Sequence, residues 1–455
     1  MGNLQLQRFC LLTIALTAVA AIGTVQKVSA QRTSVVLMES VEPRTDFVPR
    51  SNCNPQPPRH QSFDLAVVDF RDDGSLREPT QLSDALSCIQ TAGRTNQQLE
   101  LVLFVHGWRH NSSWNDAHFV EFRRLLQRLA LREVEGREGR RIFGVFVGWP
   151  GGSFLDLFNP SYDRAQQIGK GLQFKQMLWE LVDTTRKSAT NSTVVFAGHS
   201  LGAAMLEAGY ANLLTEVINA PAALSQAQND PCKSYTGLQR PELLPDLVLL
   251  LGTASEASLT ESVIAKIRSK ISKRITCDAD FEAPLVAYVA SETDRATGFA
   301  FWIRRGLERT AGNTDALITH EFVLDRPSNG RTGHSCPAIR SLEDFGQSWH
   351  CLRTPLTMGA RVTTMTVDLP RIDDPRDPCH ERYVARPNPR FTGTDIPPFW
   401  IIRVPDDIVS GHSDIFNARS TLMAMALLQM SGAIVGIWES YSQMFEPDQG
   451  VCLFR

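Results

Sequence analysis

Short apolar runs rich in β-branched residues alternate along this chain with segments whose apolar residues recur at helical spacing. Seven of these runs are predicted to be strands: DLAVVDF from Asp64, LELVLFVHGW from Leu99, RIFGVFVGWP from Arg141, TVVFAGHS from Thr193, DLVLLLGTAS from Asp246, PLVAYVASETD from Pro284 and FWIIRVP from Phe399. Because the runs are almost continuously apolar, the strands are expected to be covered on both faces, as in a parallel sheet.

The segment from Trp114 to Val134 has a clear helical pattern, with arginine and glutamate gathered on its polar side. Its apolar face is made by Phe119, Phe122, Leu125, Leu126 and Leu129. Strands that alternate with such helices predict an α/β fold with a mostly parallel central sheet flanked by helices.

The composition is typical of a folded protein of this kind, and its charge limits the classes of partner that the protein is expected to bind. The chain has 455 residues, of which 43% are hydrophobic and 21% charged, with a formal net charge of −3. This length allows one large domain with insertions or two domains. The weak net charge offers neither a basic stripe for nucleic acid nor a polybasic patch for anionic lipid. We therefore expect no nucleic-acid partner.

The N-terminus has the parts of a secretory signal peptide. Arg8 precedes an apolar run that begins at Phe9, and small residues end the segment at Ala30, where cleavage is predicted. We expect residues 1–30 to be removed, residues 31–60 to form an N-terminal extension, and the protein to be secreted or periplasmic. The alternative is an uncleaved membrane anchor, although the run is short for a span of about 20 residues. Membrane contact is expected only through this segment.

Cysteine usage agrees with export. Once Cys10 is removed with the signal peptide, eight cysteines remain: Cys53, Cys88, Cys232, Cys277, Cys336, Cys351, Cys379 and Cys452. An even number indicates structural disulfides in an oxidising compartment, although the sequence leaves their pairing open and several buried free thiols are the alternative. The pairing we expect in the long segment before Phe399 is Cys336 with Cys351, which would help to fix that segment.

The stretch TVVFAGHSLGAAMLEAGYA, from Thr193 to Ala211, places Ser200 between two glycines where a strand pattern gives way to a helix pattern. Gly198 and Gly202 permit a turn in which larger side chains would collide with the strand or the helix. Such a turn holds the serine in a strained conformation, with its hydroxyl at the carboxyl end of the sheet. Ser200 is therefore the candidate nucleophile, and the alternative is a serine that merely caps a helix.

A serine nucleophile needs a base and a carboxylate that orients the base. His412 follows the last predicted strand and precedes an apolar helical run, which makes it the candidate base. Asp294 stands at the end of the strand that begins at Pro284, and Glu256, after the preceding strand, is the alternative acid. The order Ser200, Asp294, His412 is the serine, acid, histidine order expected for this arrangement.

With this triad and the run His106-Gly107-Trp108 after an earlier strand, most of the chain resembles the α/β-hydrolase superfamily, in its serine esterase and lipase branch. The resemblance implies an oxyanion hole formed by the backbone amides of Leu201, which follows the nucleophile, and Trp108. The HGGG form found in some lipases is absent. The run GWPGGS from Gly148 resembles the loop that lines such sites after the next strand.

Residues 61–455 are expected to form the hydrolase-like domain, with a long insertion at about 300–398 before the last strand. A single crossover helix would need a few tens of residues, whereas this segment has roughly a hundred. It contains the edge-strand pattern ARVTTMTVDL and a proline-rich run. Because the insertion leaves the sheet at the end where the site is expected, we expect it to form a lid or cap.

These features favour a secreted serine hydrolase that cleaves a carboxylic ester through a Ser-His-Asp triad and an acyl-enzyme. The mechanism needs no metal or organic cofactor, and the expected partner is a small-molecule or lipid ester substrate. Acyl transfer to an alcohol or amine, or peptide cleavage, would use the same triad. A non-catalytic binding protein on the same scaffold is the alternative from another functional class.

Overall fold

The computed structural model describes most of the chain between residues 63 and 294 and shorter pieces on either side. The described residues are 36–38, 63–96, 98–135, 139–152, 158–219, 243–255, 257–267, 284–291, 293–294, 321–325, 365–369, 381–387, 399–406, 408–417, 420–421, 423–424 and 427. The expected signal peptide, the alternative acid Glu256 and the expected pair Cys336 and Cys351 lie outside these residues. Within the described part of the chain, no helix is both long enough and apolar enough to cross a membrane.

The described elements alternate between strands and helices over much of their length. The strands are β1 (Val36–Met38), β2 (Phe63–Asp69), β3 (Gln98–Val105), β4 (Arg141–Gly148), β5 (Asn191–His199), β6 (Leu247–Leu251), β7 (Val286–Ser291), β8 (Glu321–Asp325), β9 (Met365–Leu369), β10 (Glu381–Pro387) and β11 (Phe399–Val404). The helices are α2 (Pro79–Asn96), α3 (Ala117–Glu135), α4 (Phe158–Lys170), α5 (Leu172–Ser188), α6 (Leu201–Asn219) and α8 (Ala257–Lys266). All seven strands predicted from the apolar runs are present, as β2 to β7 and β11.

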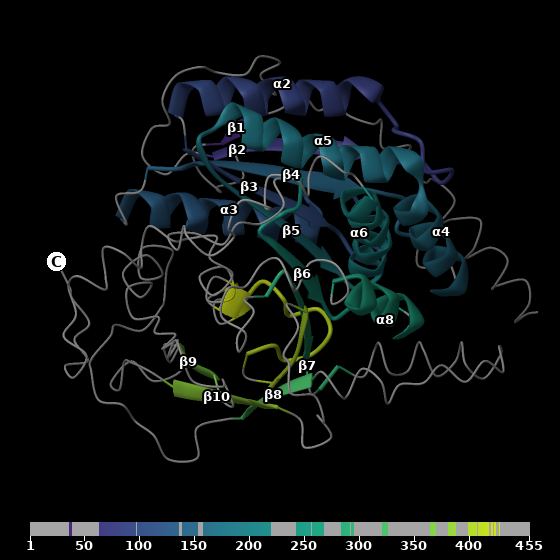
Figure 1. Cartoon of the computed structure of the whole chain (residues 1–455), viewed down its shortest axis with the longest axis vertical. Helices are drawn as coiled ribbons and strands as arrows, with labels where there is room; N and C mark the ends of the chain where they lie inside the picture. The colour runs from purple at the N-terminus through teal and green to yellow at the C-terminus, as the bar shows by residue number, and fades with distance from the viewer. Residues whose placement is uncertain are drawn as a thin grey trace, which may run out of the picture. The chain divides into compact units, whose positions relative to one another are not determined.

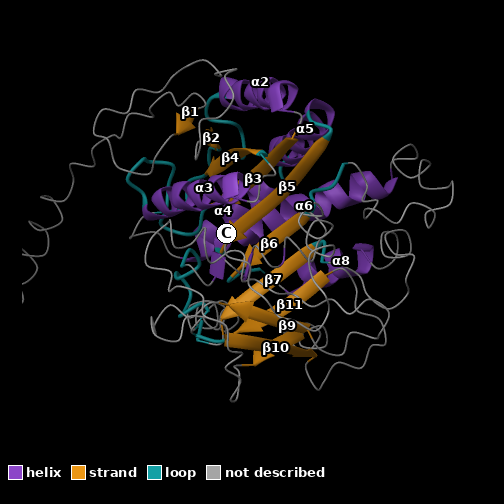
Figure 2. Ribbon diagram, turned by 90° about the vertical axis from the view of Figure 1, so that its left-hand side faces the viewer, coloured by secondary structure: helices purple, strands orange, loops and turns teal. Residues whose placement is uncertain are grey.

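The strands form one sheet in the order β1-β2-β4-β3-β5-β6-β7-β11-β8-β10-β9. Every pairing from β2 along this order to β8 is parallel. β1 pairs antiparallel with β2, and β10 pairs antiparallel with both β8 and β9. Figure 2 shows the strands from β2 to β11 side by side in this order. The predicted α/β class with a mostly parallel central sheet is therefore confirmed.

Helices cover both faces of this sheet, which explains why its strands are apolar on both sides (Figure 1). On one face, residues of α2, α4, α5, α6 and α8 pack against the strands in one continuous core. On the other face, α3 and the segment after β11 form a second core. Figure 1 shows α2 and α5 together at one end of the sheet and α6 beside α4 and α8.

Helix α3 begins three residues later than the predicted start at Trp114, because Asp116 caps it. The Asp116 carboxylate accepts a hydrogen bond of 2.9 Å from the backbone N–H of His118, which satisfies one of the free donors at the helix start. The apolar face is as predicted. Four of its five residues are at most 2% exposed, namely Phe119, Phe122, Leu126 and Leu129, while Leu125 is partly buried.

Three strands lie within the segment predicted to be a lid or cap. β8, β9 and β10 extend the sheet beyond β11, and β9 forms its edge, as the pattern ARVTTMTVDL predicted. The remainder of residues 300–398 lies outside the described residues. The described pieces of the insertion thus add to the sheet, and a cover over the site stays a prediction.

The order of the strands makes the end of the sheet beside β3 and β5 the position where a ligand site is expected. These two strands are neighbours, yet the chain leaves β3 through α3 on one face and reaches β5 through α4 and α5 on the other. Where connections diverge in this way, the carboxyl ends of the strands border a crevice that binds ligands in open α/β sheets. Ser200 directly follows β5, and His106 directly follows β3, so both lie at this position.

Candidate functional site

Ser200 occupies a sharp turn between β5 and α6, as the sequence predicted. Its φ angle is 54°, in the left-handed region that non-glycine residues rarely adopt. The flanking glycines allow the close approach that this turn requires. A Cβ at Gly202 would lie 2.2 Å from the carbonyl oxygen of His106, and one at Gly198 would lie 2.8 Å from Cα of Ala203. The turn therefore depends on glycine at both positions.

The Ser200 hydroxyl is joined to His412 and Asp294 by an unbroken chain of hydrogen bonds. Ser200 Oγ lies 2.8 Å from His412 Nε2. His412 Nδ1 lies 2.9 Å from Asp294 Oδ2 on its other side. Because a carboxylate only accepts, Nδ1 carries the proton and donates to Asp294, which leaves Nε2 free to accept from the serine. The three residues are 94 or more positions apart in sequence and meet at the ends of β5, β7 and β11.

Asp294, the acidic member of these hydrogen bonds, is shielded from solvent, while His412 is partly exposed. The Asp294 side chain is 4% exposed and the His412 side chain is 21% exposed. A shielded carboxylate attracts the imidazolium more strongly than one in water would. Partial exposure of the imidazole is what a base needs if it must meet a substrate.

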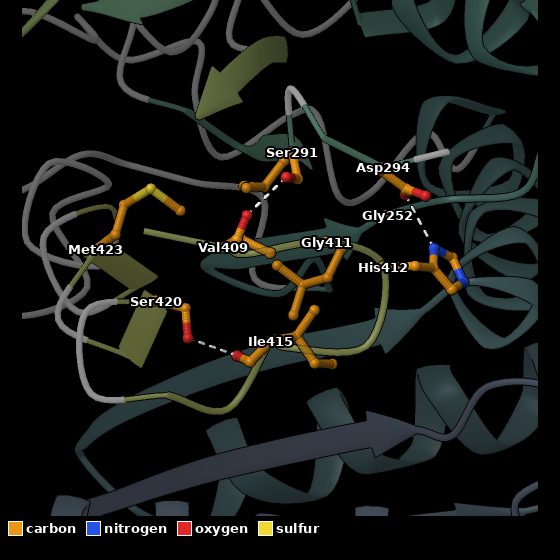
Figure 3. Close-up of a pocket in the computed structure, with 11 residues that line it drawn as sticks. Gly252, Ser291, Asp294, Val409, Gly411, His412, Ile415, Ser420 and Met423 are labelled. Atoms are coloured by element: carbon orange, nitrogen blue, oxygen red, sulfur yellow. Dashed lines mark hydrogen bonds and ion pairs between the residues drawn. The ribbon is translucent and has the colours of Figure 1, made fainter. Parts of the chain in front are cut away.

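A small pocket lies beside the Asp294–His412 pair, and Figure 3 shows the imidazole turned toward the Asp294 carboxylate. Its apolar lining residues are Leu251, Val289, Val409, Ile415 and Met423. Figure 3 also shows the hydroxyl of Ser291, at the end of β7, bonded to the carbonyl of Val409, at 2.6 Å. This contact fastens the loop that carries His412 to the strand that precedes Asp294.

Asp414 organises the loop that carries His412. Its Oδ2 accepts hydrogen bonds from the Ser410 hydroxyl at 2.7 Å and from the Asn417 amide at 3.0 Å. The same Asn417 amide donates to the carbonyl of Ile408 at 2.8 Å. These bonds close the loop on itself and limit the positions that the His412 backbone can take.

The loop after β3 packs against the serine turn. A Cβ at Gly107 would lie 3.4 Å from Cβ of Ser200 and 2.9 Å from Nδ1 of His199. Trp108 follows at this contact, and Leu201 is the first residue of α6, where backbone N–H groups have no partner within the helix. The two residues proposed for the oxyanion hole thus belong to segments that meet at Ser200.

His106 links this loop to the segment after β4 by hydrogen bonds. It is fully buried, and its Nε2 accepts a 3.1 Å hydrogen bond from the backbone N–H of Trp149, while Nδ1 donates to the carbonyl of Gly107 at 2.9 Å. The Trp149 indole returns a 2.8 Å bond to the carbonyl of His106, and the two rings stack at 5.5 Å. The run GWPGG therefore supports the loop after β3. The resemblance had implied only that this run lines the site.

Backbone strain recurs in this loop at Arg109, whose φ angle is 64°. Its backbone N–H donates to the carbonyl of Gly151 at 3.0 Å, and its guanidinium lies over the Trp108 ring at 4.0 Å. These contacts offset the cost of the strained conformation and hold Arg109, and with it the loop at Trp108, in place.

Two further buried histidines lie near the hydrogen-bonded residues Ser200 and His412. His199 donates from Nε2 to the carbonyl of His412 at 2.6 Å, and its Nδ1 is buried without a hydrogen-bond partner among the described residues. His118 accepts a 3.4 Å bond from the backbone N–H of Gly107. Burial lowers the pKa of His199 to about 3 and of His106 to about 4, and it also lowers the pKa of His118. All three imidazoles are therefore neutral at neutral pH.

We expect this histidine cluster to make the protein sensitive to mild acid. In the unfolded chain His106, His118 and His199 would titrate near pH 6.5, well above their pKa values in the folded state. Their contribution to stability is complete above that pH and is lost as the pH falls below it, because the unfolded state then binds more protons. Each of the three histidines takes up one proton on unfolding. Burial raises the pKa of Glu207 to about 7, so this group is protonated in the folded state over the same pH range and offsets the effect of one histidine.

The expected net effect is a loss of about 2 kcal/mol in the free energy of unfolding between pH 7.5 and pH 5.5. Denaturant unfolding at the two pH values measures it. Glu207→Gln removes the opposing group and should steepen the loss. Equal or greater stability at pH 5.5 in the native protein would contradict neutral burial of the cluster.

The sequence-based site residues fall into two groups. Ser200 and Asp294 both bond His412, and Trp108 and Leu201 lie on segments adjacent to Ser200. Glu256, the alternative acid, lies outside the described residues. Sequence reasoning missed the buried histidines 118 and 199, and it used His106 only as part of the run His106-Gly107-Trp108, without a role for its side chain. The histidine in GHS at position 199 was visible as part of the motif, but nothing in the sequence indicated its bond to a residue 213 positions away.

Comparison of the chain with protein-family models, with curated proteins and with solved structures finds no match in any of the three. Function must therefore be argued from the geometry of the site.

Proposed function

We propose that this chain is a serine hydrolase with an α/β-hydrolase fold, which cleaves a carboxylic ester through an acyl-enzyme. The observation that carries the proposal is the hydrogen-bonded chain from Ser200 through His412 to Asp294, with Ser200 held at a φ angle of 54°. A helix cap explains neither the bonded histidine nor the strained turn. The place of Ser200 directly after β5, beside β3, where the connections of the sheet diverge, supports the same proposal.

The proposed mechanism uses Ser200 as nucleophile and His412 as the group that carries the proton at each step. His412 Nε2 accepts the proton as Ser200 Oγ attacks the carbonyl carbon, and Asp294 stabilises the imidazolium that forms. The backbone amides of Leu201 and Trp108 hold the negative charge that develops on the carbonyl oxygen. His412 then returns its proton to the leaving alcohol. A water molecule, deprotonated by the same imidazole, releases the acyl group from Ser200.

A panel of p-nitrophenyl esters with increasing acyl chain length tests this proposal on the purified mature protein. We expect hydrolysis that a serine-directed phosphonate abolishes, and the preferred chain length would define the size of the substrate. Acyl transfer would appear as an ester or amide product when an alcohol or amine is added. A protein that hydrolyses none of the esters and does not react with the phosphonate would favour the binding role and overturn the proposal.

We also propose that the protein is exported, as its signal-like N-terminus indicates. Cys88, on α2, is disulfide-bonded, which supports an oxidising compartment. Peptide mapping of the non-reduced protein would identify its partner and test the bridge expected between Cys336 and Cys351. Recovery of these two as free thiols from exported protein would contradict that expected bridge.

A further inference from the structure

A buried carboxyl group lies on the nucleophile's own helix, outside the triad. Glu207 is seven positions after Ser200 in α6 and is 1% exposed. Its Oε2 accepts a short hydrogen bond from the Ser255 hydroxyl, and its Oε1 accepts one of 2.6 Å from the Thr260 hydroxyl. Ser255 ends the described loop after β6, and Thr260 belongs to α8. One side chain therefore ties α6 to both.

The loop held by this carboxyl group contacts all three triad residues. Gly252, whose φ angle is 51°, lies so close that a Cβ there would be 3.4 Å from both Asp294 Oδ2 and His412 Nδ1. At Ser200, the backbone N–H donates to the carbonyl of Leu251 at 2.9 Å, and the carbonyl accepts from the N–H of Ala254 at 3.2 Å. A displacement of residues 252–255 would move the nucleophile relative to its base and acid.

Tyr288 holds the same loop from the side of the sheet. It lies on β7, and its hydroxyl donates to the carbonyl of Thr253 at 2.8 Å. The loop is thus fixed by Tyr288 near its start and by Glu207 at its end. Burial raises the pKa of the Glu207 carboxyl group to about 7, which shows that its burial is costly. A leucine at this position would avoid that cost, but it would form no hydrogen bond to Ser255 or Thr260.

We propose that Glu207 is a positioning residue of the triad: by binding Ser255 it fixes the 252–255 loop against Ser200, Asp294 and His412. This inference rests on the proposed hydrolase function. It predicts that loss of the carboxyl group impairs the chemical step more than substrate binding, since the loop contacts the reacting groups. It also predicts that Glu207 and Ser255 act as a unit.

The test measures kcat and KM for a reactive p-nitrophenyl ester, with the melting temperature, in Glu207→Ala, Ser255→Ala and the double variant. We expect each single change to lower kcat about tenfold or more while KM stays within about twofold of the native value. The kcat of the double variant should be no lower than that of the less active single variant. Glu207→Gln should retain more activity than Glu207→Ala, because its amide can still bond both hydroxyl groups.

Leu181→Ala, in the buried core on α5, is the control for stability. It should lower the melting temperature and leave kcat near that of the native protein. Ser255→Ala removes one hydroxyl at a partly buried position, so it remains informative if Glu207→Ala does not fold. A kcat within twofold of native for Ser255→Ala, or losses that multiply in the double variant, would overturn the positioning role. A native protein that hydrolyses no ester would instead overturn the proposed function, and this inference with it.

Discussion

Ser200→Ala is expected to abolish ester hydrolysis with little loss of stability. The substitution removes the oxygen that attacks the substrate's carbonyl carbon and carries the acyl group, so kcat/KM should fall by a factor on the order of 10⁴ to 10⁶. Alanine and serine tolerate the φ angle of 54° about equally, and the lost hydrogen bond to His412 involves a partly exposed ring. The melting temperature should therefore stay close to that of the native protein.

A matched control for this variant is Ser161→Ala on α4. Ser161 is fully buried, and its hydroxyl has no hydrogen-bond partner among the described residues, so its removal should leave activity unchanged. If Ser200→Ala kept more than about a hundredth of native turnover, Ser200 would not be the nucleophile, because loss of a nucleophile costs far more than that.

Asp294→Asn should have the second largest effect, a loss of about a thousandfold or more in kcat. The carboxylate accepts from His412 Nδ1 at 2.9 Å and so keeps the proton on that nitrogen. An amide N–H turned toward Nδ1 would favour the other tautomer, in which Nε2 carries the proton and cannot accept from Ser200. The removal of the negative charge also leaves the imidazolium unstabilised.

Glu256→Gln is the comparison that decides between the two acids considered from the sequence. Glu256 follows β6, while Asp294 follows β7 and bonds the imidazole, so the larger loss should fall on Asp294. Steady-state kinetics of both variants with one ester would measure the ranking. A larger loss for Glu256→Gln would transfer the orienting role to that residue.

The elements, and the polar residues that meet at the ends of β5, β7 and β11, could be predicted because their signals are local. A continuous apolar run marks a buried strand, and the glycines around Ser200 mark a tight turn between a strand and a helix. The carboxyl ends of parallel strands lie at one edge of a sheet, so polar residues that follow such strands could be expected to meet. Asp294 and His412 were found in this way, although 118 positions separate them.

The supporting contacts could not be predicted, because they join residues without a sequence pattern in common. Glu207 looks like an ordinary polar residue in a helix, yet it is buried against partners 48 and 53 positions further along the chain. The addition of β8, β9 and β10 to the sheet edge likewise depends on pairing between distant segments. Such long-range pairing follows from the folded backbone and leaves little trace in composition or periodicity.

Identification of the residue that a serine-directed phosphonate modifies tests the central claim most directly. The native protein would be treated with the phosphonate, weighed intact and then mapped by peptide mass spectrometry, with His412→Ala treated in parallel. We predict a single adduct on the peptide that contains Ser200, formed much more slowly in the His412 variant because its nucleophile has lost its base. An adduct on a different serine, or ester hydrolysis that persists without any adduct, would contradict the assignment of Ser200 as nucleophile.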